Sequence, residues 1–218
     1  MRSSARQLIA LFGLLSGVSL ALFLFGALQN REWTHFYLFW NLFLAWLPLL
    51  LALLLREQLK TQRWSSWLPL VTTFAWLGFL PNTFYMVTDY IHLQDVARVD
   101  IIFDTVMFTL PIATAFGLGL VSMYLVHQQL QRRMDWLRTW RVMSVVALLS
   151  GFAIYIGRFL RWNTWDMITN PSGILFDLSD MLIQPFAHLQ MVTTTVSFFV
   201  LIMAGYVALR WGVRVSRR

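Results

Sequence analysis

The chain has 218 residues, a formal net charge of +7, a hydrophobic fraction of 58% and no cysteine. Without cysteine it can form no disulfide, use no thiol nucleophile and offer no cysteine ligand to a metal. A charge of +7 on a soluble chain would suggest nucleic-acid binding, but this hydrophobic fraction indicates a membrane protein instead. No nucleic-acid partner is therefore expected.

Six apolar stretches are long enough to cross a bilayer, whose hydrocarbon core is about 30 Å thick. They cover Leu8–Leu28, Phe36–Leu55, Trp64–Leu80, Ile101–Val126, Val142–Leu160 and His188–Leu209. The first has 21 residues, which is longer than the apolar core of a secretion signal, and no small-x-small cleavage site follows it. It is therefore expected to be an anchor. The sequence predicts an all-α, six-span transmembrane helix bundle that forms a single domain over residues 1–218.

Basic residues alternate from one side of the predicted membrane to the other. The two terminal tails and the second and fourth gaps between spans hold 13 of the 17 Lys and Arg residues. The odd-numbered gaps hold only Arg31, Arg98, Arg158 and Arg161. Short loops rich in Lys and Arg stay in the cytoplasm. This pattern predicts cytoplasmic N and C termini, with the lipid bilayer as a partner.

The end of the third span carries an unusual mixture of apolar and polar residues. Pro81 lacks an N–H and disfavours helix at Leu80, so we expect a broken helix after Leu80. If helix then resumes, Asp89 and His92 are three residues apart and share a face. Two interpretations stay open here: a proline-capped helix end with an interfacial turn, or a functional break at membrane depth.

Arg158 and Arg161 lie one turn apart at the outer end of the fifth span. Each guanidinium offers a planar fork of donors that suits a phosphate or a carboxylate. Asp104, four residues into the fourth span, is expected at a similar depth and is the first candidate partner for Arg158. The pair is open to two interpretations, an anion-binding site or an ion pair that locks the helices together.

Acidic residues gather outside, where eight of the ten are expected. Between Pro171 and Pro185, polar and apolar residues separate onto two faces, which predicts an outer amphipathic segment. His92, His188 and the aspartates could offer mixed ligands to a divalent cation. Their spacing matches no fixed metal motif, so no metal site and no cofactor are predicted.

Glycines mark points of close helix packing. Gly13 and Gly17 form a small-xxx-small pattern that would let another helix of this chain, or of a second copy, approach closely. Gly117 and Gly119 are expected to do the same in the fourth span. The oligomeric state is left open by these patterns.

Two outer blocks together resemble an uncharacterised family of bacterial integral membrane proteins, the domain of unknown function 1361. The first block is matched by Leu80, Pro81, Asn82, Tyr85, Thr88, Asp89, His92 and Leu93. The second is matched by Gly157, Arg158, Phe159, Arg161, Asn163, Trp165 and Asp166. The chain departs from the common pattern at Thr83-Phe84, where Ala-Pro is frequent, and at Thr164, where Ser is frequent. The resemblance covers nearly the whole chain and brings no activity. It implies a small multi-pass protein of a bacterial cytoplasmic (inner) membrane whose polar blocks face outward.

These observations favour an outward-facing polar site that binds an anionic lipid head group or an envelope-related small ligand or precursor. The expected ligand-binding residues are Asn82, Tyr85, Asp89, His92, Asp104, Arg158, Arg161, Asn163, Trp165 and Asp166. Asp89, His92 or Asp104 could act as a general base or a metal ligand, with catalysis left open. The alternatives are a small transporter or ion carrier and a non-catalytic assembly subunit. Few polar residues occupy the inner halves of the spans, which counts against a transport path.

Overall fold

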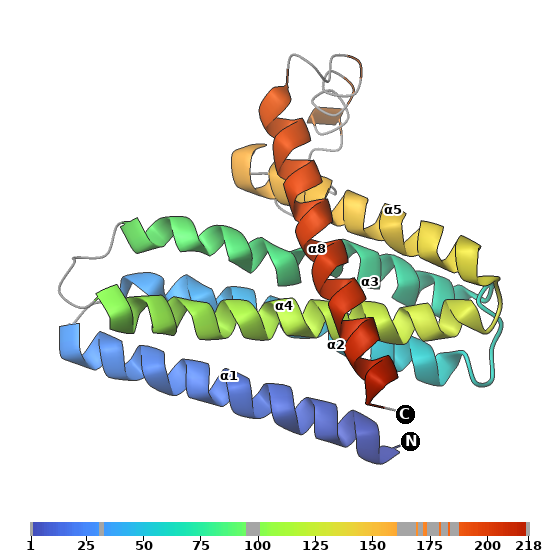
Figure 1. The fold of residues 1–218 in the computed structure, drawn as a ribbon, viewed down its shortest axis with the longest axis horizontal. Helices are drawn as coiled ribbons and strands as arrows, with labels where there is room; N and C mark the ends of the chain where they lie inside the picture. The colour runs from blue at the N-terminus through green and yellow to red at the C-terminus, as the bar shows by residue number, and fades with distance from the viewer. Residues whose placement is uncertain are drawn as a thin grey trace. The chain divides into compact units, whose positions relative to one another are not determined.

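The computed structural model describes residues 2–30, 33–94, 101–160, 169, 172–173, 179, 183 and 188–216. Every regular element in these ranges is a helix, and most are long α-helices (Figure 1). The elements are α1 (Arg2–Asn30), η1 (Thr34–Phe36), α2 (Tyr37–Gln58), α3 (Trp67–Tyr85), η2 (Met86–Gln94), α4 (Ile101–Gln131), α5 (Trp136–Tyr155), η3 (Ile156–Leu160) and α8 (Leu189–Val215). The first two η segments are 3-10 helices and η3 is a π-helix.

Within the described residues, six helical segments are long and apolar enough to cross a membrane. The all-α, six-span prediction is confirmed. Boundaries differ where polar residues join the helix ends: α5 begins at Trp136 instead of Val142, and α8 continues to Val215. Asp135 explains the early start of α5, because its carboxylate accepts a hydrogen bond from the Arg138 backbone N–H at 2.7 Å and so caps the helix.

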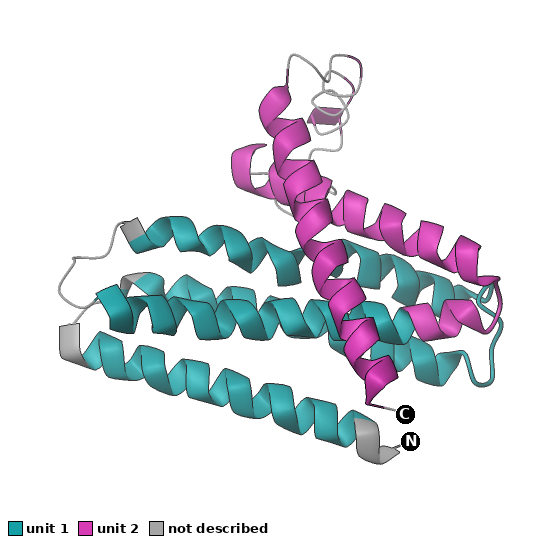
Figure 2. Cartoon of the chain, viewed as in Figure 1, with its two compact units in different colours: residues 1–126 teal, residues 127–218 magenta. Residues whose placement is uncertain are grey.

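The helices group into two compact units, residues 1–126 and residues 127–218 (Figure 2). The boundary between them falls inside α4, which runs from Ile101 to Gln131. The single-domain organisation stays a prediction, and each unit is described by itself below.

The first unit has a core built on one face of α2. Its buried residues recur mostly three or four apart, as one face of a helix requires, and are Leu38, Leu42, Ala45, Pro48, Leu49, Ala52 and Leu55. This face packs against α3. The apolar stripe in the sequence thus becomes the contact that organises the unit.

Close approach of helices in the first unit depends on glycine in α4. A Cβ atom at Gly119 would lie 2.2 Å from Thr83 Oγ1, and one at Gly117 would lie 3.0 Å from a ring carbon of Phe12. These two glycines pack as expected from the sequence. A Cβ at Gly13 or Gly17 would have nothing within 4 Å among the described residues. The predicted close contact at Gly13 and Gly17 is therefore absent from the described part of the chain.

The change of geometry near Pro81 comes later than the sequence predicted. Helix α3 continues through Pro81 to Tyr85 and only then tightens into the 3-10 helix η2. A bilayer offers no water to compete for backbone groups, so helices continue through proline where nearby hydroxyls satisfy the freed carbonyls. Here the carbonyl that loses its N–H partner is that of Leu77, four residues before Pro81, while the Thr83 hydroxyl donates to the Leu80 carbonyl at 2.7 Å. The break predicted after Leu80 is thus displaced by five residues.

The second unit is centred on the packing of α5 against α8. A Cβ at Gly151 would lie 2.6 Å from the backbone carbonyl oxygen of Thr195, so the two backbones touch at this point. Beyond it, α5 passes into the π-helix Ile156–Leu160. The predicted outer amphipathic segment between Pro171 and Pro185 falls almost entirely outside the described residues.

Candidate functional site

A buried carboxylate lies where η2 packs against the beginning of α2. Asp89 has only 1% of its surface exposed, and the Asn41 side-chain amide donates a hydrogen bond to its Oδ2 at 3.1 Å. In a 3-10 helix, residues three apart eclipse each other, so Asp89 lies on the same side as the fully buried Met86. The apolar anchor at Met86 therefore draws the carboxylate into the unit. Asp89 has further polar or electrostatic partners, as a buried charge requires.

Two histidines and a tyrosine form a series of ring contacts in the same part of the unit. The ring of His92 lies 5.3 Å from that of Tyr37, and Tyr37 lies 6.0 Å from His35, all as ring centroid distances. Tyr37 and Asn41 are one turn apart on α2, while Asp89 and His92 are three apart on η2. Each element thus presents two polar groups on one face. The name Asp89 cluster is used below for His35, Tyr37, Asn41, Asp89 and His92.

Asp104 lies in the first turn of α4 and is 5% exposed. A carboxylate in a first helical turn is stabilised by the helix dipole. One turn later on the same face, Phe108 contacts the ring of His35 at 5.1 Å. Asp104 therefore lies on the face of α4 that is turned toward η1 and the Asp89 cluster.

The remaining predicted residues of the first block lie around this cluster. Asn82 and Tyr85 are half-buried in the last turns of α3, and the Thr88 hydroxyl donates to the Tyr85 carbonyl at 2.8 Å. The Tyr90 hydroxyl forms a 3.0 Å hydrogen bond with Thr109, which ties η2 to α4. The block thus lies at a junction of three elements of the first unit.

Arg158 belongs to the second unit, where it is half-buried on the π-helix η3. A π-helix has a wider turn than an α-helix and is found frequently at functional sites. The pairing of Arg158 with Asp104 stays a prediction. The other predicted residues of the second block, Arg161, Asn163, Trp165 and Asp166, lie outside the described residues.

Within the described ranges, no three His, Asp or Glu side chains are grouped so that they could hold a metal ion. The groups that the Asp89 cluster does offer are a carboxylate, an amide, a phenol and two imidazoles. Such groups can accept and donate hydrogen bonds and can exchange protons.

The sequence analysis missed a second polar cluster, which lies in the second unit. His127 is fully buried near the end of α4, and the Arg210 guanidinium contacts its Nε2. The His127 ring lies 5.4 Å from that of Trp140 and 5.7 Å from that of Tyr206. A histidine inside a long apolar helix was the signal that could have found this cluster, because such a residue needs a polar partner from another helix. The name His127 cluster is used below for His127, Trp140, Tyr206 and Arg210.

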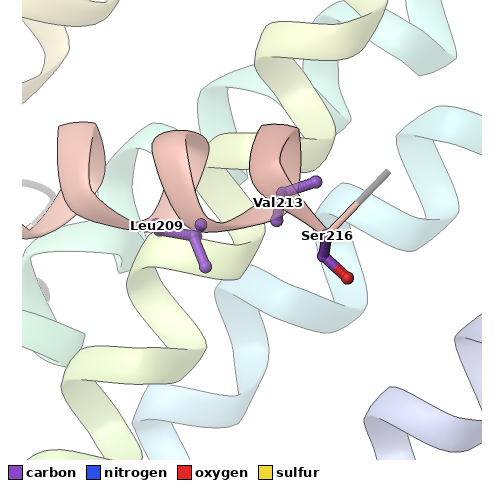
Figure 3. Close-up of a pocket in the computed structure, with 4 residues that line it drawn as sticks. Leu209, Val213 and Ser216 are labelled. Carbon is purple, nitrogen blue, oxygen red and sulfur yellow. The ribbon is translucent and has the colours of Figure 1, made fainter. Parts of the chain in front are cut away.

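A shallow hollow follows the last turns of α8, lined by Leu209, Gly212, Val213 and Ser216. Figure 3 shows the side chains of Leu209, Val213 and Ser216 along this part of the helix. The Ser216 hydroxyl is its only polar side chain, and none of the four lining residues is ionisable. The hollow therefore has almost no polar groups with which to bind a ligand specifically.

Comparison with known proteins identifies the family. A family model described as "Protein of unknown function (DUF1361)" matches residues 40–204. The chain belongs to this family. The DUF1361 region contains both outer blocks, of which the first ends in the 3-10 helix η2 and the second begins in the π-helix η3. No curated protein and no solved structure matches the chain. Family membership is thus shown, and the function has to be argued from the residues.

Proposed function

We propose that this DUF1361 protein binds an anionic ligand at a polar site facing the outer side of a bacterial cytoplasmic membrane. The ligand class is an anionic lipid head group or another small molecule of the cell envelope. The bias of Lys and Arg supports this orientation, since it favours cytoplasmic termini and outward-facing first and second blocks. Asp89, His92 and Asp104 are the candidate general bases, and Asn82 and Tyr85 are candidate ligand contacts.

One observation carries the proposal: the Asp89 carboxylate is 1% exposed in a membrane-spanning unit and is held by Asn41 at 3.1 Å. Ionisable side chains within membrane spans are costly and usually mark sites of binding or transport. The same part of the unit holds two imidazoles, His92 on η2 three residues from Asp89 and His35 on η1, and such groups can exchange protons with a ligand. An apolar residue at this position would fill the same buried space without the cost of burying a charge.

The cationic part of the proposed site comes from Arg158 with Arg161. Arg158 lies within the π-helix Ile156–Leu160, and the second block begins one residue before it, at Gly157. A guanidinium fork binds phosphate or carboxylate through two parallel hydrogen bonds. Asn163, Trp165 and Asp166 complete the proposed set of ligand contacts.

Binding is better supported than transport because three buried hydroxyls of the first unit are bonded within their own helices. Thr83, Thr114 and Ser122 each donate to a carbonyl of their own helix, at 2.7, 2.7 and 2.8 Å. Hydroxyls that are committed in this way offer few open donors to a permeating ion or to a chain of water molecules. Two of the hydrogen bonds between helices, Asn41–Asp89 and Tyr90–Thr109, lie at the end of the unit that carries η2.

Phosphatidylglycerol, an anionic phospholipid, provides a direct test. We expect the double variant Arg158→Gln/Arg161→Gln to bind it at least roughly tenfold more weakly, since a hydrogen bond to a charged group contributes about 1.5–3 kcal/mol. Binding is measured by native mass spectrometry of the full chain in an uncharged detergent. The matched control is Arg132→Gln/Arg141→Gln, which removes the same charge from two exposed residues of the second unit. Unchanged affinity in the first variant, with a retained unfolding temperature, would refute the proposal.

A further inference from the structure

Basic side chains gather where α4 ends, α5 begins and α8 ends. They are Arg132, Arg133, Arg138, Arg141, Arg210 and Arg214. Among the described residues of the second unit the one carboxylate is Asp135, which is already in contact with Arg138, with Nε 3.0 Å from Oδ2. This end of the unit therefore has an excess of positive charge.

Arg210 differs from the other cations because its guanidinium is held on two sides by uncharged rings. One terminal nitrogen contacts Nε2 of the buried His127, and the guanidinium carbon lies 5.2 Å from the ring centroid of Trp140. Within the part of the chain that the structure describes, no carboxylate pairs with Arg210. The side chain is therefore oriented without being neutralised.

The contact with His127 also determines the tautomer of that ring. Arginine has only donors, so Nε2 of His127 must accept, which leaves the proton on Nδ1 and the ring neutral. Nδ1 of His127 and Nε1 of Trp140 are buried N–H groups that have no partner among the described residues. The surroundings of Arg210 thus present further donors and no negative charge.

We propose that Arg210 is a preorganised binding group for a phosphate at the surface of the membrane. A guanidinium has five N–H donors, and the single contact with His127 leaves four of them available. Arg210 is half-buried, so part of the side chain stays accessible. A phosphate offers several charged acceptor oxygens that match this fork, whereas a cation or an apolar ligand would gain nothing there. His127 and Trp140 are positioning residues that hold the fork in place. This site is independent of the one proposed at the Asp89 cluster and Arg158.

The variant Arg210→Gln provides the test, with Arg214→Gln as its matched control. Arg214 lies one turn further along α8, carries the same charge and is exposed. The full chain in an uncharged detergent is titrated with inorganic phosphate, phosphatidic acid and phosphatidylcholine, with binding followed by native mass spectrometry. We expect Arg210→Gln to weaken the binding of inorganic phosphate or phosphatidic acid roughly tenfold. Arg214→Gln should weaken the same binding less than about twofold.

The probes distinguish the source of the phosphate. Binding of phosphatidic acid alone assigns the site to a lipid head group, and binding of inorganic phosphate as well assigns it to a free phosphate group. Failure of all three probes to bind the wild-type chain would overturn the proposal. Equal losses in the two variants would also overturn it, because they would reveal general surface charge without a built site.

A second variant separates positioning from folding. His127→Phe keeps an aromatic ring against Trp140 and Tyr206 but removes the acceptor for Arg210. We expect it to weaken phosphate binding several-fold while the unfolding temperature stays near that of the wild type. Unchanged phosphate binding in His127→Phe would show that the histidine does not orient Arg210. The variant Arg158→Gln/Arg161→Gln should leave this binding unchanged, so the two proposals can fail separately.

Discussion

The Asn41–Asp89 hydrogen bond joins Asp89, which belongs to the first sequence block, to a residue that lies outside both blocks. Asn41 lies on α2, 48 residues before Asp89, and donates to a carboxylate that is almost fully buried. Burying a charge is costly unless hydrogen bonds replace the lost water. The amide supplies one such bond without introducing a counter-charge.

Replacing Asn41 by alanine should therefore destabilise the protein. We expect the free energy of unfolding to fall by about 1–3 kcal/mol, the cost of leaving a buried charged group with one donor fewer. Chemical unfolding in mixed micelles measures it. Tyr90→Phe is the control, because it removes a hydrogen bond of similar length from the exposed side of the same 3-10 helix and should change stability by about 0.5 kcal/mol or less. Equal losses in the two variants would contradict a special role for the buried bond.

The residues of the site could be predicted only in part. Asp89 and His92 lie three apart in the sequence, and the expectation that they share a face agrees with η2. Asn41, Tyr37 and His35 reach the same place by tertiary packing, which local spacing does not encode. His127 and Arg210, 83 residues apart, meet for the same reason. A polar side chain within an apolar span was the available signal in each case, and it does not name the partner.

At the scale of the helix, the apolar runs predicted where helices would form but not how their geometry changes. Pro48, Pro81 and Pro111 all lie inside α-helices. In water, proline usually ends a helix, so Pro81 led to the expectation of a break after Leu80. Inside a bilayer the backbone has no alternative partner, and the helix continues until the chain can pack a different turn. The 3-10 helix η2 and the π-helix η3 lie within the two sequence blocks. Their geometry depends on how the side chains pack, which backbone propensity does not predict.

Gly119 offers a sharp test of helix packing. The variant Gly119→Ala would place a methyl group 2.2 Å from Thr83 Oγ1 and 2.8 Å from the buried Phe84 ring. We expect the free energy of unfolding to fall by about 1–3 kcal/mol, the usual cost of overpacking a core.

The control for this experiment is Gly78→Ala on α3, where an added Cβ has nothing within 4 Å among the described residues. Alanine is favoured over glycine in a helix by up to about 1 kcal/mol, so this variant should be neutral or more stable. A stable Gly119→Ala protein would mean that α3 and α4 are not packed as closely as described. Both are measured by thermal unfolding in detergent.

At the scale of the molecule, the sequence predicted the helical class, the six spans and the family. The two compact units were not predicted, because hydropathy indicates which segments are apolar but not which helices pack against one another. The orientation of the spans in the membrane is a proposal that rests only on the distribution of Lys and Arg.

The absence of native cysteine makes that orientation easy to measure. We expect Ile183→Cys to react with a membrane-impermeant maleimide on intact cells, and Thr61→Cys to react only after the cells are permeabilised. Both positions are exposed, and they lie in loops of opposite predicted side. The opposite pattern of labelling would place the termini outside and the two sequence blocks in the cytoplasm.

The contact between His127 and Arg210 also imposes an order on biosynthesis. The two residues are separated by 83 positions, so at ~5–20 residues per second roughly 4–17 s pass between their emergence from the ribosome. During that interval the imidazole of α4 lacks its contact with Arg210, although α5 can already cover one of its faces with Trp140. Helix α8 therefore completes the second unit after α4 and α5 have been made, and a nascent chain that stalls before residue 210 carries a polar ring without its partner.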